Sequence, residues 1–207
     1  MDYAKDIITG ESIRDSAKHC KVANSTSFRW RHRMLSHLER KARKRGGKAS
    51  QRGVSSEQTS VLIVRDRNGN TTDTILEKSN QDTLADILIP IIDKDTLLCS
   101  DKKTSYTAFA KKYHYTLETI NSSAKEYTRG IFHVQNVNAY DSRLKAWMKH
   151  FHGVATKYLT SYLGWMRLLD REKDITVRKL LAVIAGRDLF LYDVLLYVRQ
   201  VFVCIPT

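Results

Sequence analysis

Apolar positions follow two different spacings along the chain, and the spacing changes near residues 59 and 133. Between residues 12 and 35 they recur every three or four residues, which is typical of helices packed on one face. From residue 59 to 76 they form short β-favouring runs, and from residue 133 the helical spacing returns. Strands preceded and followed by helices predict a mixed α/β protein with helices packed on a sheet.

The first helical stretch predicts two helices joined by a tight turn. Ser12 with Asp15 resembles a capping box at the start of the first helix, and Asn24 or Ser25 can cap the second. A helix-turn-helix, whose second helix enters the DNA major groove, has this layout, and so does an ordinary helical hairpin. Lys21 occupies the turn position where glycine is usual, and a left-handed conformation there costs roughly 1 kcal/mol.

As a helix-turn-helix, this region would read bases with the first polar residues of its second helix and bind phosphate with the later arginines. A dense basic block follows, because residues 29–52 hold ten Lys or Arg and one acid, Glu39. Such a block is the electrostatic footprint of a polyanion-binding protein, although a solvated basic linker has the same composition. The predicted DNA-binding residues are Ser25, Thr26, Arg29, Arg31, Arg33, Lys44, Arg45 and Lys48.

The middle of the chain predicts a hairpin and then alternating helices and strands. Asn68–Gly69 lies between the apolar run Val61–Val64 and a second run through Ile75, which is the strongest short signal for a hairpin. The stretches NQDTLADILIPIID and TSYTAFAKKY then predict helices, while TLLCSD and YTLETIN predict strands. Glycine-rich phosphate loops and the GxSxG and HExxH motifs are absent from the sequence.

The composition favours an intracellular protein that binds nucleic acid. The formal net charge is +13, from 35 basic and 22 acidic residues. The three cysteines are odd in number and widely spaced, which favours reduced thiols over a structural zinc site. The sequence has neither an apolar run long enough to span a membrane nor a signal peptide at its start. We therefore expect a cytoplasmic, nucleoid-associated protein with no membrane partner.

Asp101 ends the short apolar stretch TLLCSD, at the rim of the predicted sheet. Open α/β folds place their sites at this rim, which makes Asp101 a candidate catalytic carboxylate. Because it also precedes a predicted helix, it could instead be a helix N-cap.

The stretch HVQNVNAYDSRLKAWMKHF, residues 133–151, predicts a helix with two different faces. Its apolar residues share one face, and a polar row that includes Asn138 and Lys145 shares another. An amide oxygen in this row, with cations about two turns farther on, suits a metal ion near Asn138 and a phosphate near Lys145. A merely solvated polar face is the ordinary alternative.

Several of these stretches together resemble one family. HVQNVNAYDSRLKAWM followed by HGVATKYLTSYLGWMRLLD is similar to the C-terminal block of bacterial insertion-sequence transposases of the ISXO-like group. SIRDSAKHC, STSFRWRHR and RKRGGKASQRGVSSEQTSVLIVRDRNG match the same group in the same order. The resemblance covers residues 12 to about 170 and implies an RNase H-like catalytic domain of the DDE class.

The resemblance implies DNA transposition, in which terminal inverted repeats are bound and cut and their 3′ ends are joined to target DNA. Two Mg²⁺ or Mn²⁺ ions would be held by three acidic or amide side chains. Asp101 matches the second of these positions and Asn138 the third, so both are predicted catalytic metal ligands. Lys145 matches a catalytic residue that holds DNA phosphate, His133 could contact the same site, and Asp141 stands where the family is expected to carry His. We expect a homodimer or larger assembly on paired ends.

One family feature is missing upstream. In the family, a strand that ends in the first catalytic acid precedes the basic segment, whereas here SHLERKARKRGGK follows the predicted second helix directly. Asp66 lies too close to the hairpin turn to replace that acid. We therefore expect an ion site too incomplete for strand transfer. We also expect a sheet that lacks its central first strand and is partly open, less stable or patched by a different strand order. A non-catalytic DNA-binding remnant of a transposase is the alternative function, and an unrelated basic protein is the third.

The chain is thus predicted to contain four segments: a helix-turn-helix domain at 1–36, a basic linker at 37–58, an incomplete RNase H-like domain at 59–171 and a helical tail at 172–207. In the tail, Leu180, Leu181 and Ile184 suit one helix, while Phe190, Val194 and Val198 suit another. Sequence read from flanking DNA is the alternative origin of the last part.

Overall fold

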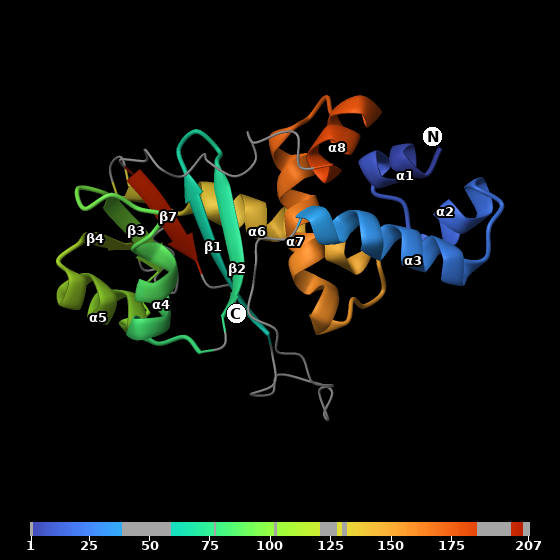
Figure 1. Cartoon of the computed structure of the whole chain (residues 1–207). Helices are drawn as coiled ribbons and strands as arrows, with labels where there is room; N and C mark the ends of the chain where they lie inside the picture. Colours follow the sequence, from blue (N-terminus) through green and yellow to red (C-terminus); the bar gives the residue numbers. More distant parts are fainter. Residues whose placement is uncertain are drawn as a thin grey trace. The chain divides into compact units, whose positions relative to one another are not determined.

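The computed structural model describes residues 2–38, 59–76, 78–101, 103–120, 128–129, 132–185 and 200–204 (Figure 1). The chain divides into two compact units, each made of two chain segments. The helical unit comprises Met1–Gly47 with Ala146–Asp193, and the sheet unit comprises Lys48–Lys145 with Val194–Thr207. This division differs from the predicted domains, because residues 146–171 group with the N-terminal helices and not with the sheet.

The described elements of the helical unit are helices. They are α1 (Asp2–Thr9), α2 (Ile13–His19), α3 (Asn24–Leu35), the 3₁₀ helix η1 (Ser36–Leu38), the end of α6 (Gln135–Lys149), α7 (Thr156–Arg171) and α8 (Val177–Ile184). Ser12 Oγ accepts a hydrogen bond from the N–H of Asp15 at 3.2 Å, which confirms the predicted cap of α2. Lys21 has a φ of +53°, so the turn between α2 and α3 holds a non-glycine residue in the left-handed region.

Aromatic residues build the core of the helical unit. Trp165 in α7 is fully buried and donates from Nε1 to the Ile7 carbonyl of α1 at 2.8 Å. The rings of Trp147, Phe151 and Tyr162 lie 4.8, 5.4 and 5.6 Å from the Trp165 ring, centroid to centroid. Aromatic pairs at such distances contribute about 0.5–1.5 kcal/mol each beyond their buried area. Trp165 therefore ties α7 to α1 and to the end of α6.

Gly164 lets α7 approach the chain closely at Leu38. A Cβ atom at position 164 would overlap the backbone carbonyl of Leu38 and would also press on the Leu38 Cβ at 3.2 Å. Backbone atoms of a packed core cannot move aside as the end of a long side chain can. The contact therefore requires a residue without a side chain.

The sheet unit is built on a five-stranded mixed sheet with the strand order β2-β1-β7-β3-β4. β1 pairs antiparallel with β2 and β7, while β3 pairs parallel with β7 and β4. The mixed α/β class is thus confirmed. The bounds are Ser60–Asp66 for β1, Thr71–Leu76 for β2, Gln81–Leu88 for α4, Leu97–Asp101 for β3, Thr104–Tyr113 for α5, Thr116–Ile120 for β4, Gln200–Cys204 for β7, and Thr128–Arg129 and Phe132–His133 for the separate pair β5 and β6.

The β1–β2 hairpin turns at Asn68–Gly69, as predicted, and Gly69 has a φ of +87°. Asp66 closes this turn, because its carboxylate accepts from the backbone N–H and the side-chain amide of Asn70 at 2.7 and 2.6 Å. In the sheet Asp66 pairs with Val201, near the start of β7. It is therefore a turn residue, in keeping with the prediction that it does not replace the missing acid.

β7 fills the central position that the sequence analysis left without a strand. Of the predicted consequences of the missing first strand, a different strand order is the one observed, because Gln200–Cys204 pairs with β1 on one side and β3 on the other. The QVFVC run is rich in β-branched and aromatic residues, and it satisfies backbone groups of β1 and β3 that would otherwise lack partners. This part of the tail is consequently a strand instead of the predicted helix. α8 confirms the first predicted helix of the tail, and the second, with Phe190, Val194 and Val198, lies outside the described residues.

Helices cover both faces of this sheet. Leu62 of β1 and Leu98 of β3 pack in one core with apolar residues of α4 and α5. Because side chains alternate along a strand, Asp73 of β2, which lies opposite Ile63, faces the other way. There the Tyr140 hydroxyl of α6 donates to the Asp73 carboxylate at 2.7 Å. In Figure 1, α6 accordingly passes behind β1 and β2.

Candidate functional site

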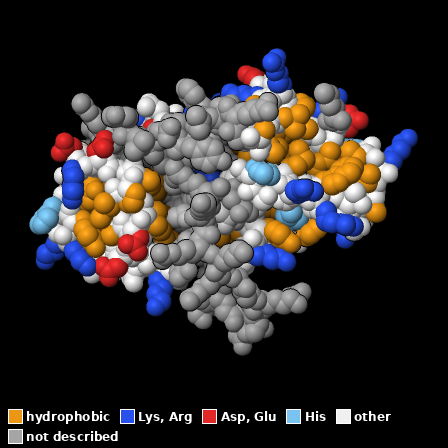
Figure 2. Space-filling view, in the orientation of Figure 1, with side chains coloured by type: hydrophobic (Ala, Val, Ile, Leu, Met, Phe, Trp, Pro, Cys, Tyr) orange, Lys and Arg blue, Asp and Glu red, His pale blue; other side chains and the backbone are white. Residues whose placement is uncertain are grey.

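The outer stripe of α3 carries most of the predicted DNA-contacting residues of this helix. Ser25, Arg29 and Arg33 are exposed, and they share one side of α3 because four residues make about one helical turn. Thr26 is half-buried. Figure 2 shows Lys, Arg and His side chains among exposed hydrophobic ones over the helical unit. The remaining predicted DNA-binding residues, Lys44, Arg45 and Lys48, lie outside the described residues.

Arg31 does not belong to this stripe. Its side chain is fully buried, and its Nη2 donates to Ser16 Oγ at 2.9 Å. Its guanidinium carbon lies 5.1 Å from the centroid of the Trp165 ring, a cation–π distance. The prediction that Arg31 binds DNA phosphate is therefore wrong. Ser27, Arg31 and Leu35 follow one another every fourth residue and form the inner stripe of α3.

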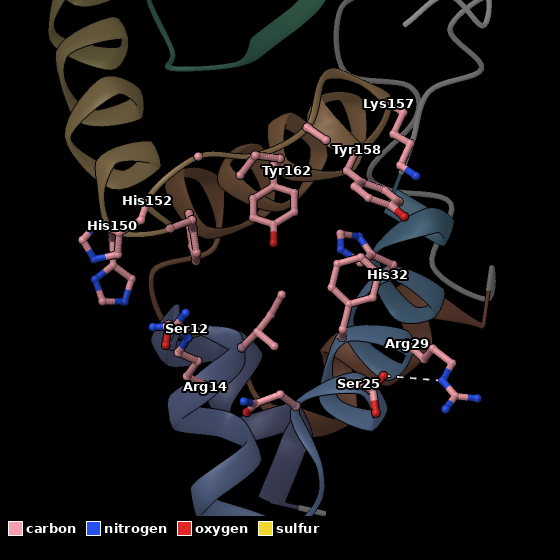
Figure 3. Close-up of a pocket in the computed structure, with 17 residues that line it drawn as sticks. Ser12, Arg14, Ser25, Arg29, His32, His150, His152, Lys157, Tyr158 and Tyr162 are labelled. Carbon is pink, nitrogen blue, oxygen red and sulfur yellow. Dashed lines mark hydrogen bonds between the residues drawn. The ribbon is translucent and has the colours of Figure 1, made fainter. Parts of the chain in front are cut away.

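A pocket of about 1040 Å³, here named the basic pocket, lies beside the start of α3 (Figure 3). Its walls come from the start of α2, the first turns of α3, residues 150–155 and the first turns of α7. The lining contains neither Asp nor Glu. Its basic and imidazole side chains are Arg14, Arg29, His32, His150, His152 and Lys157.

An aromatic cluster forms one wall of the basic pocket. His32 of α3 stacks on Tyr158 of α7, with ring centroids 3.7 Å apart and ring planes 23° apart. Phe28 meets both rings at an angle, 4.2 Å from His32 and 5.6 Å from Tyr158. Burial, followed by the positive charges of Arg31 and Lys157, lowers the pKa of His32 to about 4. His32 is therefore neutral at pH 7 and adds no positive charge to the pocket.

The sequence analysis anticipated only Ser25 and Arg29 of this pocket. The other side of the pocket is closed by residues from His150 to Lys157. In the sequence these residues were part of the stretch that resembles the transposases, and no binding role was predicted for them. A usable signal was present, because the sequence HFHG places two histidines around Phe151 directly before a helix. What the sequence did not show is that this segment lies beside the start of α3.

In the sheet unit, Asp101 is a carboxylate at the end of β3, as predicted. Its Oδ1 atom is buried and has no hydrogen-bond partner in the described part of the chain. Burial raises the pKa of Asp101, and the positive charge of Lys103 opposes that effect. The alternative N-cap role is wrong, because α5 begins at Thr104 and its N-cap residue is Lys103.

Asn138 and Lys145 lie on α6, as predicted. Asn138 is half-buried and Lys145 is exposed. Lys145 Nζ forms an ion pair with the Asp141 carboxylate at 3.0 Å, one helical turn away. Asp141, which departs from the family pattern, therefore partly neutralises the lysine that was predicted to hold DNA phosphate.

Strand alternation places Asp101 on the sheet face that α6 covers. Leu98 points into the core with α4 and α5, so Cys99 and Asp101 lie on the opposite face. On the neighbouring strand β4, Glu118 pairs with Cys99 and therefore lies on the same face as Asp101, two residues away along the strands. Within the described residues no group of three or more His, Cys, Asp or Glu side chains could hold a metal ion.

Asp101 and Asn138, the two predicted metal ligands, carry oxygens that suit a hard cation. An unpartnered carboxylate oxygen on Asp101 and an amide oxygen on Asn138 are of the type that Mg²⁺ or Mn²⁺ binds. Because Mg²⁺ requires about six oxygens in near-octahedral geometry, water or DNA phosphate would have to supply the rest. Two ions held side by side would need more acidic ligands than the described residues bring together.

Comparison with known proteins gives one match. Residues 31–167, more than half of the chain, match the family described as the ISXO2-like transposase domain. Neither the curated proteins nor the solved structures contain a match. In the described residues, no helix has both the length and the apolar character that crossing a membrane requires.

Proposed function

Because the chain belongs to the ISXO2-like transposase domain family, we propose that it binds the terminal inverted repeats of an insertion sequence through a helix-turn-helix formed by α2 and α3. The observation that carries this proposal is the division of α3 into two stripes. Ser27, Arg31 and Leu35 are buried, while Ser25, Arg29 and Arg33 remain on the outside, available to a DNA groove. The left-handed turn at Lys21 supports the same assignment.

Within this proposal, each part of the outer stripe has its own task. Ser25 and Arg29, in the first two turns of α3, are placed to meet base edges, since a recognition helix reads bases with its N-terminal residues. Arg33, farther along, would bind backbone phosphate and set the register on the duplex. Lys44, Arg45 and Lys48 would add phosphate contacts that do not depend on sequence.

The experiment is a binding titration with the inverted repeats that flank the gene. We expect the chain to prefer a repeat duplex to a scrambled duplex of equal length. Arg29→Ala should cost about 1–3 kcal/mol of that binding and should relax the preference. Lys5→Ala, an exposed lysine on α1, is the matched control and should leave it unchanged. Equal affinity for both duplexes in the unaltered chain would contradict repeat recognition.

We further propose that this transposase copy binds ends without completing strand transfer. Asp101 and Asn138 would hold a single Mg²⁺ or Mn²⁺ ion, and Lys145 would approach a phosphate once released from Asp141. A bound ion in such enzymes activates the attacking water or 3′-hydroxyl and stabilises the leaving oxygen. What supports inactivity is that the described residues contain no group of three or more His, Cys, Asp or Glu side chains that could hold a metal ion.

Incubation of a repeat duplex with the chain and Mg²⁺ or Mn²⁺ tests this second point. We expect no nicked or joined products above those given by Asp101→Asn. Metal-dependent nicks at the repeat ends that disappear in Asp101→Asn would instead show an active enzyme of the RNase H-like class. A non-catalytic repeat binder of this kind would compete with an intact transposase, and binding of two ends would require at least two copies.

A further inference from the structure

We infer that the basic pocket binds an unpaired nucleotide of the DNA strand that lies on α3. The inference rests on the proposed function, because it takes the end of an element's DNA as the ligand. It goes further by assigning a site to the strand itself, separate from the groove contacts of Ser25 and Arg33.

The charge of the basic pocket favours an anionic ligand. Arg14, Arg29 and Lys157 face no acidic side chain in the lining of the pocket, so their field attracts phosphate. The pocket also meets the starts of two helices. The N-cap residues of α3 and α7, Ala23 and Ala155, make no side-chain capping hydrogen bond. The free N–H groups of such helix starts bind anions, and α3 and α7 have 12 and 16 residues.

The aromatic wall of the basic pocket favours a ligand that has a base as well as a phosphate, because phosphate binding requires no aromatic ring. Phe28 is 38 % exposed although it is a large apolar side chain. Beside it, the stacked pair of His32 and Tyr158 presents flat rings, and Lys157 Nζ lies 4.7 Å from the Tyr158 ring centroid. Aromatic rings next to cations are the usual receptors of unpaired bases, which stack on the rings while the cations hold the backbone. A base inside a duplex has both faces covered by its neighbours and cannot stack in this way.

The size and position of the basic pocket favour a nucleotide within a DNA strand over a free mononucleotide. The volume of about 1040 Å³ lies at the upper end of the range for small-molecule sites, about 300–1,000 Å³. It therefore leaves room for a nucleotide together with its flanking phosphates. Arg29 lines the pocket and also belongs to the outer stripe of α3, so a strand bound along that stripe reaches the pocket without a second docking step. A free mononucleotide does not bind along this stripe and would have to enter the pocket from solution.

The experiment compares blunt repeat duplexes with duplexes that carry a three-nucleotide overhang containing 2-aminopurine. We expect about tenfold tighter binding of the overhang duplex and quenching of the 2-aminopurine by stacking. Phe28→Ala should abolish both effects, and Lys157→Gln should weaken the overhang preference severalfold. Trp30→Ala is the control for Phe28, since Trp30 is also on α3, is 43 % exposed and does not line the pocket. Lys5→Gln is the control for Lys157, and melting temperatures confirm that each variant is folded.

The outcomes separate the pocket from the groove. Blunt and overhang duplexes bound equally well by the unaltered chain, or a preference that Trp30→Ala removes as fully as Phe28→Ala, would overturn the inference. Free dAMP that binds as tightly as the overhang duplex would overturn it as well, in favour of a mononucleotide site. An overhang preference that persists on scrambled duplexes, without repeat preference, would uphold the pocket and refute repeat recognition. A preference for the repeat without a preference for the overhang would uphold repeat recognition and refute the nucleotide site in the pocket.

Discussion

The helical unit and the sheet unit handle charge in opposite ways. In the helical unit Arg14, Arg29 and Lys157 line one pocket whose lining contains neither Asp nor Glu. In the sheet unit Asp101 and Asp141 each keep one buried carboxylate oxygen without a hydrogen-bond partner among the described residues, and Lys145 is already paired with Asp141. The first arrangement attracts a polyanion through a sum of small contacts, whereas the second needs every ligand at once.

This difference explains how a transposase chain can keep one activity without the other. Each phosphate contact adds a modest, separable share to DNA affinity, so the loss of one leaves binding weakened but present. A two-ion site behaves otherwise, because a missing ligand removes the geometry on which both ions depend. We therefore expect DNA binding to outlast catalysis in this chain.

The largest effect is expected at Gly164, on which the packing of the helical unit depends. Gly164→Ala should lower the free energy of unfolding by more than about 3 kcal/mol, because the added methyl group overlaps the Leu38 carbonyl. Chemical denaturation followed by circular dichroism measures this change. Lys157→Ala, at an exposed position of the same helix, is the control. A Gly164→Ala variant as stable as that control would mean that α7 and Leu38 do not approach so closely.

The second effect distinguishes a buried arginine from a DNA-binding one. Arg31→Ala should cost about 3 kcal/mol of stability, through lost packing on Trp165 and the lost hydrogen bond to Ser16. Arg33→Ala should change stability by less than about 0.5 kcal/mol and should weaken DNA binding instead. Thermal melts and duplex titrations of both variants provide the comparison. The reverse pattern would place Arg31 on the DNA side of α3.

The sheet unit has its own buried polar support. Tyr140→Phe removes the hydroxyl that donates to Asp73 and should cost roughly 2 kcal/mol, because the bond is to a buried carboxylate. Hydrogen exchange should show the loss at β1 and β2 first, since α6 meets the sheet there. Repeat binding should remain close to that of the unaltered chain. Protection that falls equally in α3 would show that the two units unfold together.

The smallest effect concerns pH and belongs to the helical unit. The pKa of His32 is about 4 in the folded chain and near 6.5 in the unfolded chain. As the pH falls from about 6.5 to about 4, the unfolded state gains a proton that the folded state does not, so stability decreases over this window. His32→Phe keeps a ring on Tyr158 but does not titrate, and it should flatten this part of the stability profile. Trp30→Phe, a substitution on α3 that changes no titrating group, should leave the slope unchanged.

Local signals in the sequence predicted most of the elements. The cap at Ser12, the Asn68–Gly69 turn and the helical period of α6 are each encoded within a few residues, and all three are confirmed. β7 could not be predicted in this way, because both of its partners are about a hundred residues or more away along the chain. β7 pairs there because β1 and β3 each have an edge without a partner strand. The sequence around residue 200 carries no information about those edges.

The candidate sites were predictable only in part, for a related reason. On α3 the usual pattern is inverted, since Ser27 and Arg31 face the core while Phe28 and Trp30 are exposed. Sequence reasoning that assigns arginine to solvent therefore succeeds at Arg29 and Arg33 and fails at Arg31. The inversion arises because Trp165 and Ser16 form a receptor for a guanidinium, and both come from other helices.

The central place of β7 also bears on how the chain is made. About a hundred residues separate the end of β3 from the start of β7, so a ribosome would release β1 and β3 long before the strand that joins them. During that interval two inner edges stand open, and open strand edges invite pairing with other chains. We therefore expect the nascent protein to need holdase chaperones or rapid elongation to escape aggregation. Shortening the delay by permuting QVFVC to a position ahead of β1 should raise the soluble yield.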